Sequence, residues 1–351
     1  MRILLIKVKH IGDTLLMTPT AAAIQAAYPA ARISALVRSG CESILDGCPA
    51  ISEVFTTAAP EKANRPADGF LQDLRLIRTL RQRKFDYVLE LSETDRGRTL
   101  AAFCGAKHRI GCTPGPRVSW LWRRLFEKML ILDPFIGHRA ERDYQVAQNA
   151  FGLTAEVPGL VFEPSADLPW SGVNPNESYA VIHPSARWEW KRWPVEKWLE
   201  VGRFLATRFS KIVISCGPDA QEIAEARAIA EGLGPVAICT EGKLTWAQLA
   251  WVLRRARFFV GVDTAAMHLA AACGTPTVAL FGASLEHLWS PWKVLHQIVV
   301  PYEVPYVPGD DAAYLARAQV RLPSQIPAEK VIHACEDILQ RAAALKPGQR
   351  F

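Results

Sequence analysis

The sequence predicts an α/β fold made of two Rossmann-like, doubly wound domains. Short apolar runs typical of buried parallel strands alternate with helical stretches, first over residues 2–91 and again from residue 179 onward. Between the two series lies a proline-rich stretch with little periodicity, residues 158–175, which is predicted to be a linker. We therefore expect domains over residues 1–157 and 176–326, followed by a C-terminal segment, 327–351, whose helix could fold back across the first domain.

Composition places the chain among ordinary globular proteins. Half of the 351 residues are hydrophobic and 22% are charged, which excludes a disordered polymer. The net charge of +6 permits an anionic ligand or surface but does not require nucleic acid, and no nucleic-acid partner is expected. No apolar run approaches the length that spans a membrane, so we expect a cytoplasmic protein that is peripheral to a membrane at most.

The eight cysteines give no sign of a metal or redox centre. None forms a CxxC pair, and no His/Cys cluster has metal-ligand spacing. Free thiols in a reducing compartment are the simplest interpretation.

The first domain is predicted from four strands and four helices. We expect strands over 2–8, 32–37, 53–55 and 87–91, and helices over 18–27, 41–46 and 68–83, with a further helix that ends at Phe151. No GxGxxG motif follows the first strand and no Walker A motif is present, which argues against a classical dinucleotide site and a P-loop ATPase.

The segment after the first strand contains the first candidate for chemistry. Thr18 and Pro19 are the expected N-cap and first residue of a helix, because proline is tolerated there. Asp13 is then left in or beside the preceding loop. A carboxylate close to a helix N-terminus should stay ionised and available as a base, although a structural turn role is the alternative.

Residues 117–128 interrupt the α/β rhythm with a mixture of aromatic, aliphatic and basic side chains. Such a basic amphipathic segment can lie on an anionic membrane or bind lipid-linked phosphates. A surface helix whose Arg residues simply face water is the alternative.

The second domain is predicted to contain five strands and five helices. The strands are expected over 179–183, 211–216, 235–238, 257–262 and 276–280, and the helices over 194–208, 219–231, 245–255, 264–273 and 284–289. Asp263 and Thr264 stand at the carboxyl end of one strand, where open α/β sheets bind ligands. The N–H groups at residues 264–267 then form a potential anion site, although Asp263 could equally be an ordinary N-cap.

Three blocks of sequence resemble glycosyltransferase family 9, the ADP-heptose:lipopolysaccharide heptosyltransferases. They are Ile11-Gly-Asp-Thr-Leu-Leu-Met-Thr-Pro19, His183-Pro-Ser-Ala-Arg187 with Lys191-Arg-Trp-Pro194, and Asp263-Thr-Ala-Ala-Met-His268 followed by residues 274–282. The resemblance covers most of the chain and implies a GT-B architecture, with the acceptor on the N-terminal domain and the nucleotide sugar on the C-terminal one. It also implies inversion at the anomeric carbon, with no metal and no cofactor.

The resemblance assigns roles to the charged residues of these blocks. Asp13 matches the base that takes the acceptor's proton, and Lys191 matches the lysine that compensates the charge of the departing ADP. A solvated loop lysine is the alternative for Lys191. Ser185 matches one of two hydroxyl residues, but the second is replaced by Ala186, which puts one phosphate contact in doubt. Arg187 is a candidate replacement for it.

Further donor contacts are implied around these residues. Asp263 is expected to accept hydrogen bonds from the heptose hydroxyls, and the N–H groups of Thr264 and Ala265 to face the phosphates. His268 either supports the turn or reaches the phosphate. Two ribose candidates, Asp219 and Glu222, and one adenine candidate, Leu244, complete the expected donor site. Leu244 is also where a hydrophobic staple would fall.

The acceptor side is less defined. Candidate contacts are Lys9, His10, Arg123 and Arg124. The expected partners are ADP-heptose and a lipid A-core acceptor at the cytoplasmic face of the inner membrane, and the N-terminal block looks most like a heptosyltransferase III branch. Two alternatives remain: a GT-B transferase for another nucleotide sugar, or a non-catalytic nucleotide- or sugar-binding protein. The oligomeric state is left open.

Overall fold

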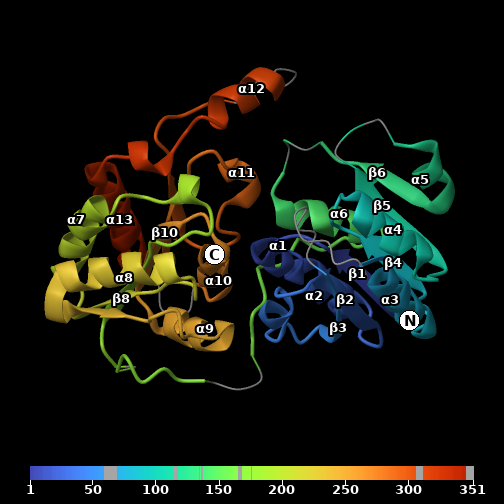
Figure 1. The fold of residues 1–351 in the computed structure, drawn as a ribbon, viewed down its shortest axis with the longest axis horizontal. Helices are drawn as coiled ribbons and strands as arrows, with labels where there is room; N and C mark the ends of the chain where they lie inside the picture. The colour runs from blue at the N-terminus through green and yellow to red at the C-terminus, as the bar shows by residue number, and fades with distance from the viewer. Residues whose placement is uncertain are drawn as a thin grey trace. The chain divides into compact units, whose positions relative to one another are not determined.

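The computed structural model describes residues 1–58, 69–113, 115, 118–133, 135, 137–164, 168–174, 176–305 and 311–344. The chain divides into two compact units, Met1–Ser165 and Ala166–Phe351, so the division falls inside the predicted linker. Each unit contains a six-stranded parallel sheet covered by helices (Figure 1), as expected of two doubly wound domains, although only four and five strands were predicted.

The sheet of the first unit has the strand order β3-β2-β1-β4-β5-β6. Its strands are β1 (Arg2–Lys7), β2 (Arg32–Arg38), β3 (Ile51–Thr57), β4 (Tyr87–Glu90), β5 (His108–Thr113) and β6 (Lys128–Ile131). Ile3 to Ile6 are fully buried because both faces of the central strand are covered. The connections run outward in opposite directions from β1 and β4, which creates a topological switch point between these two strands.

The helices of the first unit are α1 (Ile11–Leu16), α2 (Thr18–Ala27), α3 (Gly69–Gln82), α4 (Asp95–Phe103), α5 (Trp120–Leu125) and α6 (Arg139–Phe151), with a 3-10 helix over Glu42–Leu45. One prediction here was wrong in an important place. Asp13 does not lie in a loop, because α1 begins at Ile11 and places it in its first turn. Six residues are too few to show a helical period, and α2 starts only two residues after α1 ends.

The start of the predicted linker belongs to the first unit. Leu160 and Phe162 are buried, and the Val161 N–H donates to the Thr18 hydroxyl at 3.0 Å. A Cβ on Gly47 would lie only 2.7 Å from the Phe162 ring, so this glycine makes room for the aromatic side chain. Apolar residues between the prolines therefore pack residues 160–162 against the first unit instead of leaving them as free linker.

The sheet of the second unit has the order β12-β11-β10-β7-β8-β9. Its strands are β7 (Tyr179–His183), β8 (Lys211–Ile214), β9 (Ala237–Cys239), β10 (Phe258–Val262), β11 (Thr277–Leu280) and β12 (His296–Val299). Its helices are α7 (Val195–Ala206), α8 (Ala220–Leu233), α9 (Trp246–Arg255), α10 (Ala265–Ala272), α11 (Glu286–Trp289), α12 (Asp311–Ala318) and α13 (Ala328–Ala344), with 3-10 helices over Glu189–Lys191, Gly234–Val236 and Pro323–Gln325. The switch point of this sheet lies between β7 and β10.

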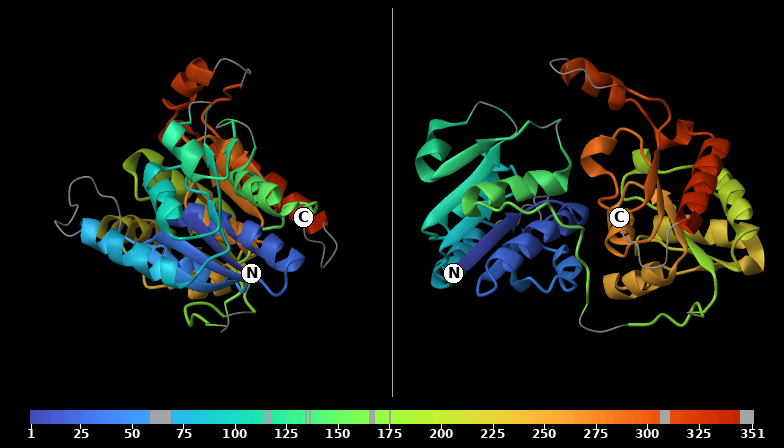
Figure 2. Two further views of the ribbon diagram at one scale, coloured as in Figure 1. Left: turned by 90° about the vertical axis from the view of Figure 1, so that its right-hand side faces the viewer. Right: turned by 180° about the vertical axis from the view of Figure 1, so that it is seen from behind.

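The last helix, α13, is part of the second unit. Its buried residues Val331, Cys335 and Ile338 join the core formed under β7, β8 and β10, and the helix packs against β11, β12 and α7 (Figure 2). Among the described residues, no helix is both long enough and apolar enough to cross a lipid bilayer.

Candidate active site

Asp13 lies at the switch point of the first unit, just after β1. Its Oδ2 accepts a hydrogen bond from the His10 N–H at 3.3 Å, which anchors the carboxylate to the start of α1. Within the described part of the chain, its Oδ1 is buried and has no hydrogen-bond partner. A buried carboxylate oxygen without a partner costs free energy unless something else uses it, so this oxygen is a candidate proton acceptor.

A buried ion pair lies at the end of β1, the strand that precedes Asp13. Lys7, the last residue of β1, donates to both carboxylate oxygens of Asp143 at 2.7 Å and to the Leu91 carbonyl at 3.0 Å. Burial opposes its charge, but Asp143 and then Asp13 outweigh that effect, so the pKa of Lys7 is raised. Burial raises the pKa of Asp143 to about 6 despite the lysine, so both groups are charged at neutral pH.

A second charge cluster adjoins this pair. Glu93 follows β4 and binds Arg139 at 3.2 Å and Arg142 at 2.5 Å. Burial works against the Glu93 charge, yet the two guanidinium groups bring the pKa of Glu93 down to about 2. Glu93 adopts a left-handed backbone with φ of 57°, which a non-glycine residue holds only when its surroundings fix it.

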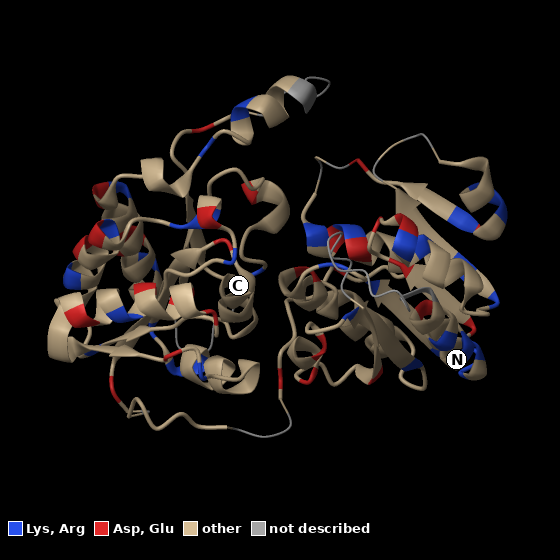
Figure 3. Cartoon of the chain, viewed as in Figure 1, with Lys and Arg blue, Asp and Glu red and all other residues tan. Residues whose placement is uncertain are grey.

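The acceptor candidates of the first unit fall in two places. Lys9 is half-buried near Asp13, and burial, followed by the charge of Lys7, lowers its pKa. His10 is exposed, and its Nδ1 lies 3.4 Å from the Arg38 guanidinium. Arg123 and Arg124 are also exposed, and they lie in the last turn of α5, the helix that precedes the edge strand β6. Figure 3 shows basic residues on this part of the first unit.

In the second unit, Lys191 and Asp263 meet at the switch point. The Lys191 ammonium donates to Asp263 Oδ2 at 2.5 Å and to the Asp263 carbonyl at 3.3 Å. Lys191 ends the 3-10 helix after β7, and Asp263 directly follows β10, its neighbour in the sheet. Strand order thus brings together two residues that lie 72 positions apart, as the sequence-based assignment requires.

The N-terminus of α10 faces the same edge. Thr264 is its N-cap and has an extended backbone, but its side chain makes no capping hydrogen bond to the helix. The first-turn N–H groups, starting at Ala265, are therefore not satisfied by a side-chain cap and can bind an anion. His268 is buried in the second turn of this helix, so most of its surface is not available to a ligand.

Ser185 adds a hydroxyl to this edge. It lies two residues after β7 and is fully buried, and its Oγ has no hydrogen-bond partner among the described residues. The neighbouring His183 is bound to the Ser215 hydroxyl at 2.9 Å, and burial lowers the pKa of His183 to about 4, so it is neutral at pH 7. Arg187 is exposed and its guanidinium lies 5.6 Å over the Trp188 ring.

The structure separates the two ribose candidates. Asp219 is the N-cap of α8 and accepts from the Gln221 and Glu222 N–H groups at 2.9 and 3.4 Å. Glu222 folds back to accept the Gly217 N–H at 3.0 Å, and burial raises its pKa. Leu244 precedes Thr245, the N-cap of α9, which is also the position of a hydrophobic staple. Its side chain is half-buried.

Comparison with known proteins identifies the family. A family model described as glycosyltransferase family 9 (heptosyltransferase) matches residues 74–307. The chain belongs to glycosyltransferase family 9. Lipopolysaccharide heptosyltransferase 3 of Escherichia coli K12 is 30% identical over 95% of this chain and 97% of its own length. Lipopolysaccharide heptosyltransferase 1 of Pseudomonas aeruginosa is 27% identical over 99% of this chain and 88% of its own.

Solved structures show that this glycosyltransferase has the GT-B fold of its family. A family 9 glycosyl transferase from Veillonella parvula superposes with a TM-score of 0.81, at 22% identity and 97% coverage of both chains. The E. coli heptosyltransferase WaaC with ADP gives 0.75, at 21% identity, covering 96% of this chain and all of that one. The predicted fold class is thereby confirmed, and the family match together with the E. coli relative confirms the enzyme class.

Several charged residues in the first unit of this family 9 enzyme had no role in the sequence-based assignment. These are Lys7, Glu93, Arg139, Arg142 and Asp143. The only local signal was a lysine at the end of a buried apolar strand, since its partners come from distant segments. The described residues contain no group of three or more His, Cys, Asp or Glu side chains that could hold a metal ion.

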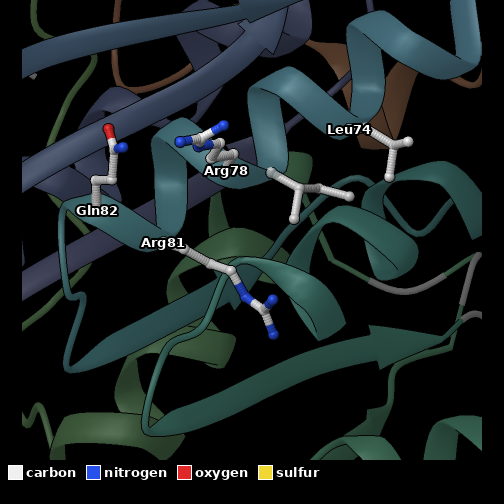
Figure 4. A pocket seen from close by; sticks show the side chains of 5 residues that line it. Leu74, Arg78, Arg81 and Gln82 are labelled. Carbon is white, nitrogen blue, oxygen red and sulfur yellow. The ribbon is translucent and has the colours of Figure 1, made fainter.

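A surface hollow of this glycosyltransferase lies elsewhere. Its lining comes from α3, with Leu74, Arg78, Arg81 and Gln82 around it (Figure 4). Because α3 leads into the N-terminal end of β4, its last turns lie toward the sheet edge opposite Asp13. The hollow is therefore separate from the candidate site.

Proposed function

We propose that this chain transfers heptose from ADP-heptose to the inner core of a lipopolysaccharide, with inversion at the anomeric carbon. The observation that carries the proposal is the pair of switch-point sites, a carboxylate in one unit and a cation beside an uncapped helix N-terminus in the other. The related E. coli enzyme named lipopolysaccharide heptosyltransferase 3, and the WaaC structures with ADP and ADP-2-deoxy-2-fluoro heptose, support this donor and acceptor.

In the proposed reaction, Asp13 Oδ1 takes the proton of the acceptor hydroxyl. The acceptor oxygen then forms a bond to the anomeric carbon while the bond from that carbon to the β-phosphate oxygen breaks on the opposite face. An oxygen that is buried and has no partner among the described residues suits this role, because no existing hydrogen bond has to be broken before the proton is accepted. Lys9 and His10 precede Asp13 in the sequence, and we propose that they contact the same acceptor.

The departing ADP develops negative charge that the protein must stabilise. The Lys191 ammonium has three N–H donors and uses two on Asp263, so one remains for a phosphate oxygen. The N–H groups at Thr264 and Ala265 and the Ser185 hydroxyl complete the phosphate site. Asp263 also accepts from the heptose hydroxyls. In this scheme protein groups supply the charge compensation, and no metal ion takes part.

The nucleoside is assigned to the loops after β8 and β9. Asp219 and Glu222 both remain ribose candidates, because Asp219 uses Oδ1 to cap α8 and Glu222 uses Oε2 on the Gly217 N–H. Leu244 is proposed to contact adenine, and His268 to support the turn at α10. Arg187 is exposed beside this edge and is retained as a further phosphate contact.

We propose that the enzyme works at the cytoplasmic face of the inner membrane, where a lipid A-core acceptor is presented. The support is α5, none of whose residues is buried. Trp120 is 75% exposed, and Arg123 and Arg124 stand on the same short helix. Aromatic and basic side chains together suit an interface between water and anionic lipid.

A panel of donors tests this function. The purified protein is given a heptose-deficient lipopolysaccharide acceptor with ADP-heptose, UDP-sugars or GDP-sugars, with and without a chelator. We expect transfer only from ADP-heptose, at an unchanged rate in the chelator. Transfer from a UDP- or GDP-sugar would instead indicate another nucleotide-sugar transferase, and tight binding of ADP-heptose without turnover would indicate a binding protein.

Asp13→Asn tests the base. The substitution should leave ADP affinity within twofold, because the ADP site lies in the other unit, and should abolish detectable transfer. Asp337→Asn on α13 is the matched control, since that carboxylate is half-exposed and pairs only with Arg341. Near-normal turnover by Asp13→Asn would remove the residue from the mechanism.

A further inference from the structure

An exposed tryptophan stands next to the lysine of the candidate donor site. Trp190 belongs to the 3-10 helix over Glu189–Lys191, and 42% of its surface is exposed. By contrast, Trp193 is buried and packs edge-on against Trp198 in the core of the second unit. A single exposed aromatic side chain needs no explanation by itself, so the surroundings of Trp190 decide what it can do.

The contacts of this segment group the Trp190 ring with the end of β10. Its centroid lies 5.2 Å from the Lys191 ammonium, which in turn binds the Asp263 carboxylate at 2.5 Å. The next residue, Arg192, contacts α8 instead, where its guanidinium lies 3.7 Å from Glu225. The loop before α8 and the start of that helix hold the ribose candidates. The ring is therefore placed with the residue assigned to the heptose, and not with those assigned to the nucleoside.

Holding Lys191 in place does not require this ring. The ammonium already donates to the carboxylate and to the carbonyl of Asp263, and a cation–π contact at a half-exposed site adds little to such a pair. The exposed part of the Trp190 side chain is apolar surface that the lysine does not cover. That surface is available to a ligand bound at Lys191 and Asp263.

A sugar is the part of a nucleotide sugar that suits such a surface. A pyranose ring carries its hydroxyl groups around the rim and presents C–H groups on its faces, whereas the face of an aromatic ring is the negative part of its quadrupole. Ligand sites commonly combine an aromatic wall with a few polar groups that fix the orientation of the ligand. Trp190 has the place of such a wall, and Asp263 and Lys191 have the places of the polar groups.

We propose that the Trp190 ring stacks against a C–H face of the donor's heptose while Asp263 accepts hydrogen bonds from the heptose hydroxyls. The ring orients the sugar above the switch point, and the sugar covers apolar surface that is exposed in the free protein. This inference rests on the proposed ADP-heptose donor and adds to it a residue that determines specificity for the sugar. The competing explanation is a ring that touches only Lys191 and so acts on the phosphates.

Two ligands that differ by the sugar separate these explanations. Isothermal titration calorimetry is performed with ADP and with ADP-2-deoxy-2-fluoro heptose, the ligand of a solved WaaC structure. In Trp190→Ala, affinity for the fluorinated donor should fall about tenfold, as expected when on the order of 50 Å² of apolar surface is no longer covered. ADP affinity should change less than about twofold, because Asp263 still holds Lys191. Trp190→Phe keeps an aromatic face and should recover most of the lost affinity.

The control is Phe103→Ala, which removes a similarly exposed aromatic side chain at the end of α4, in the other unit, and should bind both ligands as the wild type does. Thermal unfolding of every variant is measured alongside. Equal losses for the two ligands, unchanged affinity for the fluorinated donor, or a Phe variant as weak as the Ala variant would each overturn the stacking. Failure of the proposed function appears separately, in the wild-type protein, which would then bind neither ADP nor the fluorinated donor.

Discussion

Lys191 is the residue on which the proposed donor site depends most directly. It spans from the segment after β7 to the end of β10, and its ammonium keeps the Asp263 carboxylate at the mouth of α10. The Trp190 ring lies 5.2 Å from the same nitrogen and restricts its movement. A fixed cation at a helix N-terminus favours a diphosphate over a neutral ligand.

Lys191→Ala should weaken ADP binding as well as transfer. A hydrogen bond to a charged group contributes about 1.5 to 3 kcal/mol, which corresponds to a roughly 10- to 150-fold loss of ADP affinity. Isothermal titration calorimetry measures this directly. Lys211→Ala is the matched control, because Lys211 lies at the opposite, N-terminal end of the same sheet and binds the Pro235 carbonyl. Equal affinities for the two variants would remove Lys191 from the phosphate site.

Single residues show where sequence reasoning reaches its limit. Asp13, Lys191 and Asp263 were assigned from short blocks. Asp263 directly follows β10 as expected, whereas Asp13 lies in the first turn of α1 and Lys191 ends a 3-10 helix. The partners Lys7 and Asp143 lie 136 positions apart, and nothing local in either segment indicates that they meet. Their contact follows from the order β1-β4-β5 and from α6 crossing that edge, which are properties of the whole sheet.

At the scale of elements, the best predictions were the helices with strong end signals. α7 and α10 agree with the expected ranges to within two residues, since Pro194 and Gly274 mark their limits. The strands β5, β6 and β12 were missed, because they begin with the polar residues His108, Lys128 and His296 and leave only short apolar runs. α4 was missed as well, and its first residues include Arg and Gly.

The short helix α5 is the element that our membrane proposal depends on. Ser119 caps it, and it continues for only six residues before β6, so its aromatic and basic side chains are displayed at the surface. Leu121 on the same helix and Ile131 at the end of β6 are 41% and 56% exposed. Exposed apolar groups next to arginines are the pattern expected of a surface that touches anionic lipid.

Arg123→Ser/Arg124→Ser should weaken binding to vesicles that contain phosphatidylglycerol. Each arginine near an anionic surface contributes about 1 kcal/mol, so the double variant should bind roughly 30-fold less, and the wild-type binding should fall with added salt. Sedimentation with vesicles measures both effects. Arg75→Ser/Arg78→Ser on α3 is the control of equal charge in the same unit. Equal losses for the two pairs would point to net charge rather than to α5.

At the scale of the whole molecule, both units repeat one plan. In each sheet the first strand is central and a switch point lies beside it, and Asp13, Lys191 and Asp263 follow the strands that flank these points. The chemistry differs between the units. The first unit presents the Asp13 carboxylate, and the second presents a cation, a hydroxyl and a helix N-terminus.

This division predicts where ADP alone should change backbone dynamics. Because all residues assigned to the nucleotide lie in the second unit, saturating ADP should slow amide hydrogen exchange in residues 183–191, 217–222 and 263–268 and leave residues 7–13 unchanged. Exchange followed by mass spectrometry resolves these peptides, with UDP as the control nucleotide. Protection of residues 7–13 by ADP alone would contradict the assignment, because it would bring the base into the nucleotide site before any acceptor is bound. Protection confined to the second unit would leave the edge around Asp13 for the acceptor, as an attack from the face opposite ADP requires.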